Sequence, residues 1–469
     1  MNKLGITDAS FLHFERDGAP MNIASLQRFA VPYEDFDAAA FFARLKRHVA
    51  DRVHGVSFMT RRLKWTPFDL DQPVWVTDTE FDIDQHVFRS RLQAPGTDRQ
   101  LVNLVARLHE QPLDRHRPLW EIHLIDGLAD GTFAIYNKYH HAAIDGVAGQ
   151  QVMNVMYSET PDADSAPVSR SPEESAENAQ LVFEALVNLT LQPLEQFTKL
   201  GERMRAMARI TELLREAPDD AATAAAPPTP FDARVGPYRG FATTSLPLAQ
   251  MRMVGKKVGA SVNDVLLAVC AGGVREYLLR REALPDAPLL AGIPVSLRGA
   301  GDKSYSNRVG MLRSTLATHL EDPVARLEAI ARSTRAGKAL LSEAKSLIPD
   351  DIHMPGLSWL MQGAMTLSDR LRLQRVMTPA CNVLVSNVPG PRKTQYLLGA
   401  RMLTHHPVSI AADGNALNIT VQSYEGRLDL GVTTCLDAVP DVEVLRDDLE
   451  SSWLALREAF VPEALRVAA

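Results

Sequence analysis

Residues 133–146, which read FAIYNKYHHAAIDG, set the local structure of the chain and carry its most informative side chains. The segment before the two histidines is rich in aromatic and apolar residues, as is typical of a buried β-strand. Apolar residues then recur at helical spacing from Ile144 to Val155, so a helix should begin near Asp145. The histidines therefore lie in a tight passage from strand to helix, where a side chain can be presented at a cleft.

The two adjacent histidines must have different roles. Successive side chains of an extended strand point to opposite faces, so His140 and His141 cannot both face one cleft if the strand continues through them. We interpret His140 as a satisfied core histidine. His141 is the catalytic candidate, because imidazole titrates in the range where a base can accept the proton of an alcohol. Asp145 can cap the following helix, and Gly146 permits a close or unusual backbone turn.

Length and composition indicate an ordinary globular protein. The chain has 469 residues, more than one hydrophobic core usually accommodates, so two domains are expected. Apolar residues make up 46% and charged residues 23%, a balance that fits neither a disordered nor a fibrous protein. The formal charge is 50 − 57 = −7 and is not gathered in long runs of one sign, which argues against a nucleic-acid partner.

Cysteine usage and the absence of long apolar runs bear on location. Cys270, Cys381 and Cys435 are far apart in sequence, which favours free thiols in a reducing compartment, and no metal-ligand spacing predicts a metal site. The N-terminus has no apolar signal core, and no stretch approaches the roughly 18 consecutive apolar residues of a membrane span. We expect a cytoplasmic protein, with peripheral contact to the inner membrane or to lipid droplets left open.

A compositional break between Tyr157 and Gly240 predicts the domain organisation. Residues 161–179 are rich in Pro, Ser, Asp, Glu and Ala, as expected of an exposed loop, and a helical stretch follows. We predict an N-terminal domain at 1–158, a crossover linker and helix at 159–241, and a C-terminal domain at 242–469. A cleft between two such mixed α/β domains is the natural ligand site.

Periodicity predicts the main elements of each half. Helices are expected at 36–48, 101–109, 179–217 and around 445–456, together with one capped by Ser261. Strands are expected at 120–125, 132–141, 289–297, 382–387, 417–423 and 428–433, and Glu425-Gly426 suggests a hairpin turn between the last two.

The pattern His-His-x-x-x-Asp-Gly resembles the active-site motif of the CoA-dependent acyltransferase superfamily, which includes chloramphenicol acetyltransferases and peptide-synthetase condensation domains. Six further segments resemble, in the same order, those of the bacterial wax ester synthase/acyl-CoA:diacylglycerol acyltransferase family. They are TDASFLxxE at 7–15 followed by PM at 20–21, PLDxxxPLWE at 112–121, VNDV at 262–265, PVSLR at 294–298, NRVG at 307–310 and VSNVPGP at 385–391, where x is a position outside the match. The resemblance covers nearly the whole chain.

This resemblance implies an α/β (α+β) fold of two chloramphenicol-acetyltransferase-like domains, each a mixed sheet with flanking helices, around an active-site channel. It implies that His141 is the base and that Asp145 orients the loop by pairing with a basic residue. Arg298 is the candidate partner, although it can equally be an ordinary surface or strand-end arginine. The implied substrates are fatty acyl-CoA, which is a co-substrate rather than a cofactor, and diacylglycerol or a long-chain alcohol.

Two neighbouring motif residues have different expected roles. Asn263 is the candidate for the oxyanion donor or for positioning the acceptor, because its amide donates hydrogen bonds without acting as a base and a helix N-terminus favours negative charge nearby. The alternative is that Asn263 merely belongs to the first turn of the helix. Asp264 is a candidate for the substrate channel, although its position favours a structural role in the first turn of the helix.

Five further residues are candidates for the wall of the substrate channel. Pro118, Leu119 and Trp120 could shape the channel, although an aromatic beside a proline is more often core packing. Ser386 and Asn387 precede a rigid turn that could border the acyl channel.

Other functions and a second role for the crossover remain open. The 181–214 stretch combines apolar residues with several arginines, so it is either a crossover helix packed on the core or a helix that lies on a lipid surface. Besides acyl transfer from CoA, the alternatives are an acyltransferase that takes acyl groups from a carrier onto a specialised lipid, and a catalytically silent lipid-binding relative.

Overall fold

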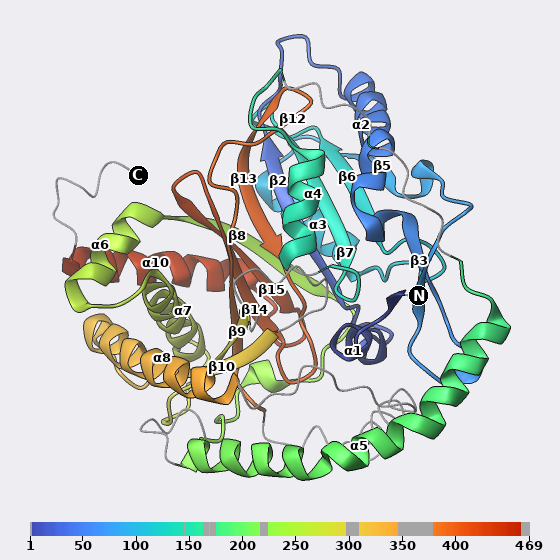
Figure 1. Ribbon diagram of the computed structural model, residues 1–469. Helices are drawn as coiled ribbons and strands as arrows, with labels where there is room; N and C mark the ends of the chain where they lie inside the picture. The colour runs from blue at the N-terminus through green and yellow to red at the C-terminus, as the bar shows by residue number, and fades with distance from the viewer. Residues whose placement is uncertain are drawn as a thin grey trace.

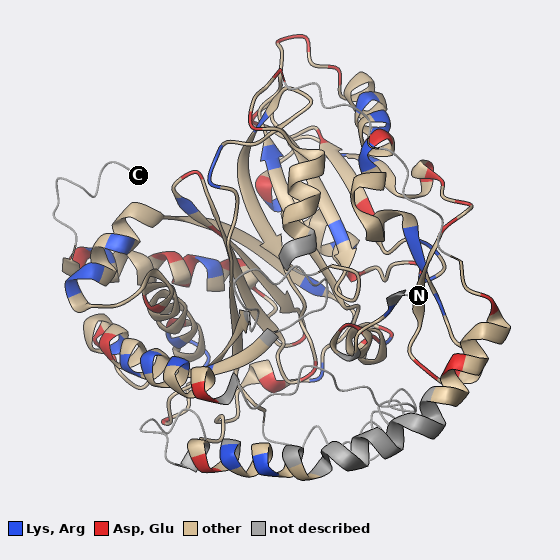
Figure 2. Cartoon of the chain, viewed as in Figure 1, with Lys and Arg blue, Asp and Glu red and all other residues tan. Residues whose placement is uncertain are grey.

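The computed structural model describes residues 2–144, 146–162, 168, 175–215, 224–296, 309–345 and 379–460. Within these residues the chain forms two six-stranded sheets, a three-stranded sheet and the helices that cover them (Figure 1). Charged residues are concentrated on helices such as α2 (Ala38–Arg52), while most of the two large sheets is uncharged (Figure 2). Burial of hydrophobic side chains between the sheets and their helices therefore organises the molecule.

The first large sheet carries the two histidines and has the strand order β12-β13-β2-β7-β6-β5. Helices α2 and α4 pack against one of its faces, and α3 packs against the other. The bounds are β2 Asn22–Phe29, β5 Val87–Arg91, β6 Trp120–Asp126, β7 Phe133–His140, β12 Tyr396–Leu397 and β13 Ala400–Val408, with α3 at Asp98–Glu110 and α4 at Gly146–Met156.

The second large sheet has the order β10-β9-β11-β14-β15-β8 and is packed against the almost fully buried helix α7. Its core joins apolar side chains from these strands with those of α6, α7, α8 and α10. The bounds are β8 Arg239–Pro247, β9 Leu290–Ser296, β10 Val309–Thr315, β11 Val383–Val388, β14 Leu417–Tyr424 and β15 Arg427–Cys435. The helices are α6 Leu248–Val258, α7 Val262–Leu279, α8 Pro323–Lys345 and α10 Val442–Phe460.

A small sheet of order β1-β4-β3 lies beside the first large sheet, and the long helix α5 (Asn178–Arg215) starts next to it. In Figure 1, α5 curves along the lower edge of the molecule from the small sheet towards α8. The remaining elements are β1 Asn2–Lys3, β3 Arg61–Lys64, β4 Val74–Thr77 and α1 Ile6–Phe14. Single 3₁₀ turns are η1 Val53–Gly55, η2 Ser57–Thr60, η3 Pro67–Asp69, η4 Ile83–Gln85 and η6 Pro230–Asp232.

The elements predicted from periodicity are confirmed, with ends shifted by a few residues. The expected hairpin turn also forms, with φ of 40° at Glu425 and 79° at Gly426. Two positive φ angles suit the right-handed twist of an antiparallel hairpin.

The boundary predicted at residue 242 does not separate the two large sheets. Strands β12 and β13 come from the second half of the sequence, yet β13 pairs with β2 in the first sheet. β13 also packs closely on β15, where a Cβ at Gly431 would lie 1.7 Å from the carbonyl oxygen of Pro407. A strand from the second half of the sequence therefore belongs to the first sheet and lies against the second.

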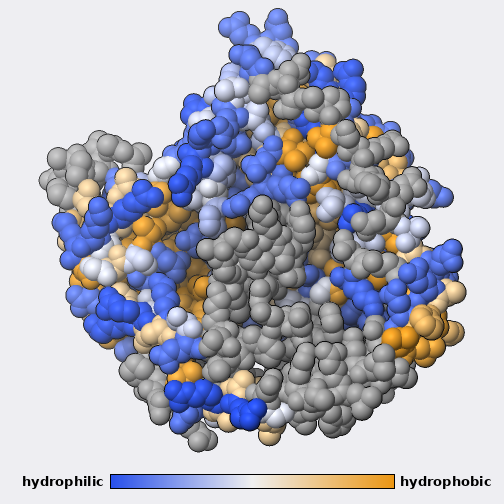
Figure 3. Space-filling view, in the orientation of Figure 1, coloured by the Kyte–Doolittle hydropathy of each residue, from blue (hydrophilic) through white to orange (hydrophobic). Residues whose placement is uncertain are grey.

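On the face seen in Figure 3, hydrophobic side chains gather at the end of α5 that lies beside the small sheet. Among the described residues no single helix has the length and apolar composition to cross a membrane. The helices α6 and α7, which meet at 99°, pass that test only as a bent pair.

Candidate active site

His140 is the last residue of β7 and is completely buried. The backbone N–H of Ala142 donates to His140 Nδ1 at 3.0 Å, so the proton of the neutral ring lies on Nε2. That Nε2–H donates to Glu15 Oε2 at 3.2 Å. Both ring nitrogens are thus engaged, which matches the structural role predicted for His140.

Glu15 follows α1 and joins three parts of the chain. Its Oε1 accepts from Arg115 Nε at 3.0 Å and Nη2 at 2.8 Å, and its Oε2 accepts from the N–H of Met21 at 3.0 Å as well as from His140. Burial by itself opposes ionisation, but the hydrogen bonds from His140 and the Met21 N–H and the positive charge of Arg115 lower the pKa of Glu15 to about 2. Glu15 is therefore ionised at neutral pH.

His141 is half-buried and lies just beyond the end of the strand. Its backbone N–H donates to the carbonyl of Met21 at 2.9 Å. Its ring stacks on Phe11, with ring centroids 3.9 Å apart and planes inclined by 12°. The segment that Glu15 holds through Met21 thus also holds the backbone of His141, and α1 supplies a flat surface that orients the imidazole.

A second charged pair lies on the face of β7 that carries His140. Lys138 is fully buried, and its Nζ donates to Glu121 Oε2 at 3.1 Å, where His123 Nε2 also lies at 3.2 Å. Burial lowers the pKa of Lys138, while the negative charge of Glu121 opposes this shift. The pair fixes β7 to β6 immediately before the histidines.

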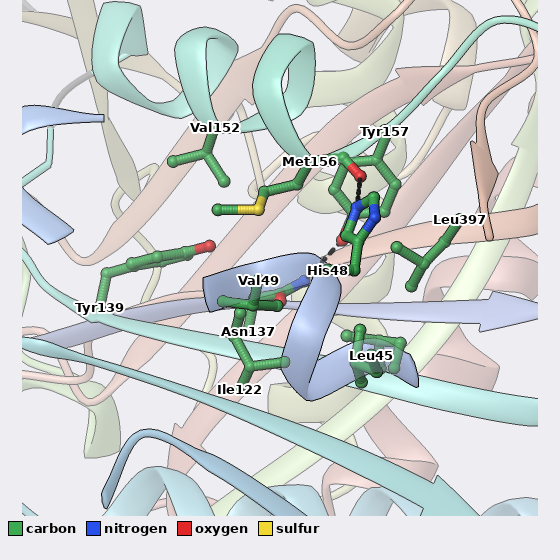
Figure 4. A pocket seen from close by; sticks show the side chains of 11 residues that line it. Leu45, His48, Val49, Ile122, Asn137, Tyr139, Val152, Met156, Tyr157 and Leu397 are labelled. Carbon is green, nitrogen blue, oxygen red and sulfur yellow. Dashed lines mark hydrogen bonds between the residues drawn. The ribbon is translucent and has the colours of Figure 1, made fainter. Parts of the chain in front are cut away.

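A pocket of about 280 Å³, counting space open to solvent, lies on the opposite face of β7 (Figure 4). Tyr139 and Asn137 line it from the strand, and Val152 and Met156 line it from α4. His48 closes one side, with Nε2 2.8 Å from the carbonyl oxygen of Met156. The helix that follows the histidine motif is therefore packed over a small, mainly apolar space that local patterning did not predict.

Ser261, Asn263 and Asp264 begin α7 as the sequence predicts. Ser261 is the N-cap, and Asp264 Oδ2 accepts from its N–H at 2.7 Å and its hydroxyl at 2.8 Å. Asp264 Oδ1 also accepts from the hydroxyl of Thr334 at 2.7 Å. Asp264 is thus a buried capping residue, as its position in the first turn favoured, whereas the role of the half-buried Asn263 stays a prediction.

The channel candidates have different surroundings. Pro118 is buried, and Leu119 and Trp120 have no accessible surface. Trp120 donates from Nε1 to the carbonyl of Met59 at 2.9 Å and stacks on His86. A side chain without accessible surface lines no open channel, so Leu119 and Trp120 are core residues here.

The other motif residues are only partly described by the structure. Ser386 is half-buried and Asn387 exposed near the end of β11, so a channel role for them stays a prediction. Gly146 is the first residue of α4. Asp145 and Arg298 lie outside the described residues, so their pairing also stays a prediction.

Phe11, Glu15, Met21 and Arg115 are the site residues for which sequence reasoning assigned no role. The first three lie in the N-terminal segment that resembles the family, which marked them without explaining them. Nothing in the sequence pattern singled out Arg115. Their contacts join positions separated by 100 or more residues, such as Glu15 with Arg115 and His140, which local patterns do not reveal.

Family models match both halves of the chain. Residues 4–266 match the wax ester synthase/diacylglycerol acyltransferase catalytic domain, and residues 305–457 match the C-terminal domain of the same family. A Mycobacterium tuberculosis protein named as a diacylglycerol O-acyltransferase is 37% identical, covering 96% of this chain and 98% of the relative. A Mycobacterium bovis protein of the same description is 36% identical with the same coverage.

Solved structures show the same architecture. The wax ester synthase/diacylglycerol acyltransferase of Marinobacter aquaeolei is 29% identical with a TM-score of 0.70, covering 98% of this chain and 99% of that one. The first condensation domain of the calcium-dependent antibiotic synthetase is 15% identical with a TM-score of 0.58, covering 97% and 95%, which is a likeness of fold alone. These matches confirm the predicted fold class, and the chain belongs to the wax ester synthase/diacylglycerol acyltransferase family.

Proposed function

We propose that this chain transfers a fatty acyl group from acyl-CoA to the hydroxyl of diacylglycerol or a long-chain alcohol, giving triacylglycerol or a wax ester and free CoA. Its family and the names of its relatives support this reaction. The observation that carries the proposal is the pair of histidines at the end of β7, of which His140 is fixed by Glu15 while His141 is half-buried against Phe11.

His141 acts as the general base of this reaction. Its imidazole accepts the proton of the acceptor hydroxyl as that oxygen attacks the thioester carbonyl. The tetrahedral oxyanion then collapses, the carbon–sulfur bond breaks, and the CoA sulfur leaves with the proton returned by the imidazolium. The products are an ester and CoA thiol, so atoms and charge balance without a covalent enzyme intermediate, a metal or a further cofactor.

Two other motif residues support the transfer in this proposal. The amide of Asn263 donates to the oxyanion, where a preorganised donor stabilises charge that develops only in the transition state. Asp145 orients the loop that carries His141, with Arg298 as its partner. Because the acceptors and products dissolve poorly in water, we place the enzyme at a lipid surface while it works.

The decisive experiment measures CoA release from palmitoyl-CoA with hexadecanol or diacylglycerol, comparing the wild-type protein with His141→Ala and His140→Ala. We expect acceptor-dependent release that His141→Ala lowers at least about 1,000-fold, the range for loss of an essential base together with its positioning. A folded His141→Ala protein with wild-type release would show that another residue is the base.

The acceptor and donor comparison separates the remaining possibilities. The ratio of ester formed with hexadecanol and with diacylglycerol measures the acceptor preference. If CoA is released with neither acceptor but acyl groups are transferred from an acyl-carrier protein, the donor is the carrier protein and not CoA. No transfer from either donor would leave a silent lipid-binding protein.

A further inference from the structure

Helix α5 carries apolar side chains on two opposite sides, and only one side faces the protein. Leu181 is buried with Ala176 against Val74 and Val76 of the small sheet. In contrast, Phe183 is 68% exposed, and Met204 near the other end of the helix is 66% exposed. A surface helix normally has one apolar face, so the second needs an explanation.

The exposed apolar side chains among the described residues of α5 lie on one face of the helix. Leu186 and Met204 are 18 residues apart, which is about five turns of 3.6 residues, so they occupy the same face of this curved helix. Phe183 precedes Leu186 by three residues and Met207 follows Met204 by three, so the four side chains occupy an arc of about 120°. The buried Leu213, like Leu181, lies on the other side of the helix.

An exposed aromatic residue continues this surface at the start of α5. Phe68 belongs to η3, which contacts α5, and its side chain is 84% exposed. Its φ is 62°, a left-handed conformation that a phenylalanine adopts only at a cost in free energy. The turn thus holds a large apolar ring in solvent next to α5.

The charge of α5 differs between its two ends. From 178 to 198 the helix has two acidic residues, Glu184 and Glu195, and no basic ones. From 199 to 215 it has five basic and two acidic residues: Lys199, Arg203, Arg205, Arg209 and Arg215 against Glu202 and Glu212. Apolar anchors at one end and apolar side chains among basic ones at the other are typical of a helix that lies on a lipid surface.

We infer that Phe68, Phe183, Leu186, Met204 and Met207 form the docking surface by which the protein sits on a phospholipid membrane. The inference deepens the lipid-surface part of the proposed function and rests on it. The aromatic end inserts among acyl chains, and the basic end is drawn to anionic headgroups. A membrane surface is continuous, so it can contact side chains spread over the roughly 36 Å of helix axis from Phe183 to Met207.

The first test is co-sedimentation with vesicles of phosphatidylcholine alone or with one third phosphatidylglycerol. We expect F68S/F183S/L186S to lower binding at least tenfold on both vesicles, and M204S/M207S to lower it mainly on the anionic ones. The matched control Y238S/L454S replaces two exposed apolar side chains outside this surface and should bind like the wild-type protein. Binding unchanged in both surface variants would overturn the inference, as would no binding by the wild-type protein.

The second test detects insertion of one position of the chain into the membrane. Its readout is a gain of fluorescence and not a loss of vesicle binding. The native cysteines are buried, so a cysteine at position 183 can be labelled selectively with an environment-sensitive dye. Fluorescence of the F183C conjugate should rise and shift to shorter wavelength on addition of vesicles, while an L454C conjugate should not respond. Equal fluorescence changes of the two conjugates would refute a specific docking surface. A fluorescence change of the F183C conjugate that follows self-association, measured by sedimentation velocity, would assign the surface to binding of a second copy of the chain.

Activity on a water-soluble short-chain alcohol distinguishes this inference from the proposed reaction. If the docking variants keep that activity but need at least five times more vesicle-borne diacylglycerol for half-maximal rate, both are supported. Activity without vesicle binding would refute the docking surface alone, and vesicle binding without acyl transfer would refute the reaction alone.

Discussion

The carboxylate of Glu15 is the residue on which the arrangement of the two histidines depends. It accepts from Arg115, from the N–H of Met21 and from His140, while the carbonyl of Met21 accepts from the N–H of His141. Glu15 touches none of the reacting atoms in our proposal, so it acts as a positioning residue. Its effect should appear in stability and in the rate of the chemical step together.

Replacing Glu15 by glutamine tests the contribution of its charge. A carboxyl with a lowered pKa stabilises the fold fully above its ordinary value of 4.5 and loses that contribution as pH falls towards about 2. At neutral pH, E15Q should reduce the free energy of unfolding by about 1–3 kcal/mol, since buried partners lose a charged acceptor. The difference from the wild-type protein should shrink below pH 4.5.

Urea unfolding at neutral pH and at about pH 3 measures this difference. E80Q, which neutralises an exposed carboxylate, is the matched control and should change stability by less than about 0.5 kcal/mol. A difference between E15Q and the wild-type protein that stays constant as the solution is acidified would mean that the charge of Glu15 does not stabilise the fold.

The ring of Phe11 orients His141 by stacking, so its removal should slow the reaction rather than weaken substrate binding. F11A should lower kcat about tenfold with little change in KM, because a stacked aromatic pair contributes about 0.5–1.5 kcal/mol. F11Y keeps the ring and should retain most of the activity. Steady-state kinetics with palmitoyl-CoA and hexadecanol decide, and a wild-type kcat for F11A would leave the stacking without a catalytic role.

At the scale of elements, the start of α7 separates a structural from a chemical residue at adjacent positions. Asp264 closes a capping box with Ser261 and accepts from Thr334 on α8, so it joins two helices. Both oxygens of its carboxylate accept hydrogen bonds in these contacts. The neighbouring Asn263 is half-buried, and its amide is the candidate oxyanion donor.

The two residues should therefore respond in opposite ways to substitution. D264A should lower the free energy of unfolding by about 1–3 kcal/mol, because it leaves the donors of Ser261 and Thr334 without their acceptor. N263A should lower kcat about 100-fold or more while stability changes by less than about 0.5 kcal/mol. Unfolding curves and initial rates of both variants check this, and a destabilised but fully active N263A would remove it from the site.

For the molecule as a whole, the close packing of β13 on β15 holds the two large sheets together. β13 pairs with β2 in one sheet while its Pro407 meets Gly431 of the other. Two further contacts join the first part of the chain to residues that follow β13. Arg16 pairs with Asp413, and His109 Nε2 donates to the carbonyl of Ser409 at 3.0 Å. The relative placement of the sheets therefore depends on residues from both ends of the chain.

A methyl group at Gly431 should test this close packing of β13 on β15. Its Cβ would lie 1.7 Å from a backbone oxygen, which cannot be relieved by rotating a side chain, so G431A should lose about 1–3 kcal/mol or more of stability. G201A, in open space on α5, is the control and should be neutral or stabilising by about 0.5–1 kcal/mol. Thermal unfolding of both variants measures the contrast, and a stable G431A would mean that the sheets can move apart at little cost.

Much of the fold and part of the site could be predicted from the sequence. The helical spacing around Leu101 and Leu104, the capping pattern at Ser261 and the Glu425-Gly426 turn are local signals, and each produced the expected element. Strand β7 ends at His140, so the difference in burial between His140 and His141 comes from the end of the strand and not from alternation along it. In contrast, no strand was predicted at β13, and its pairing with β2, more than 350 residues away in sequence, leaves no local signal.

The sequence by itself determined many of the elements, the family and the identity of the motif residues, because periodicity, caps and ordered motifs depend on neighbouring residues. The tertiary structure alone decided which partners those residues meet: Glu15 for His140, Phe11 for His141 and the second half of the chain for the first sheet. Such partners are selected by packing and charge across long loops. Their free energy is gained only when the whole chain has folded, so no local pattern records it.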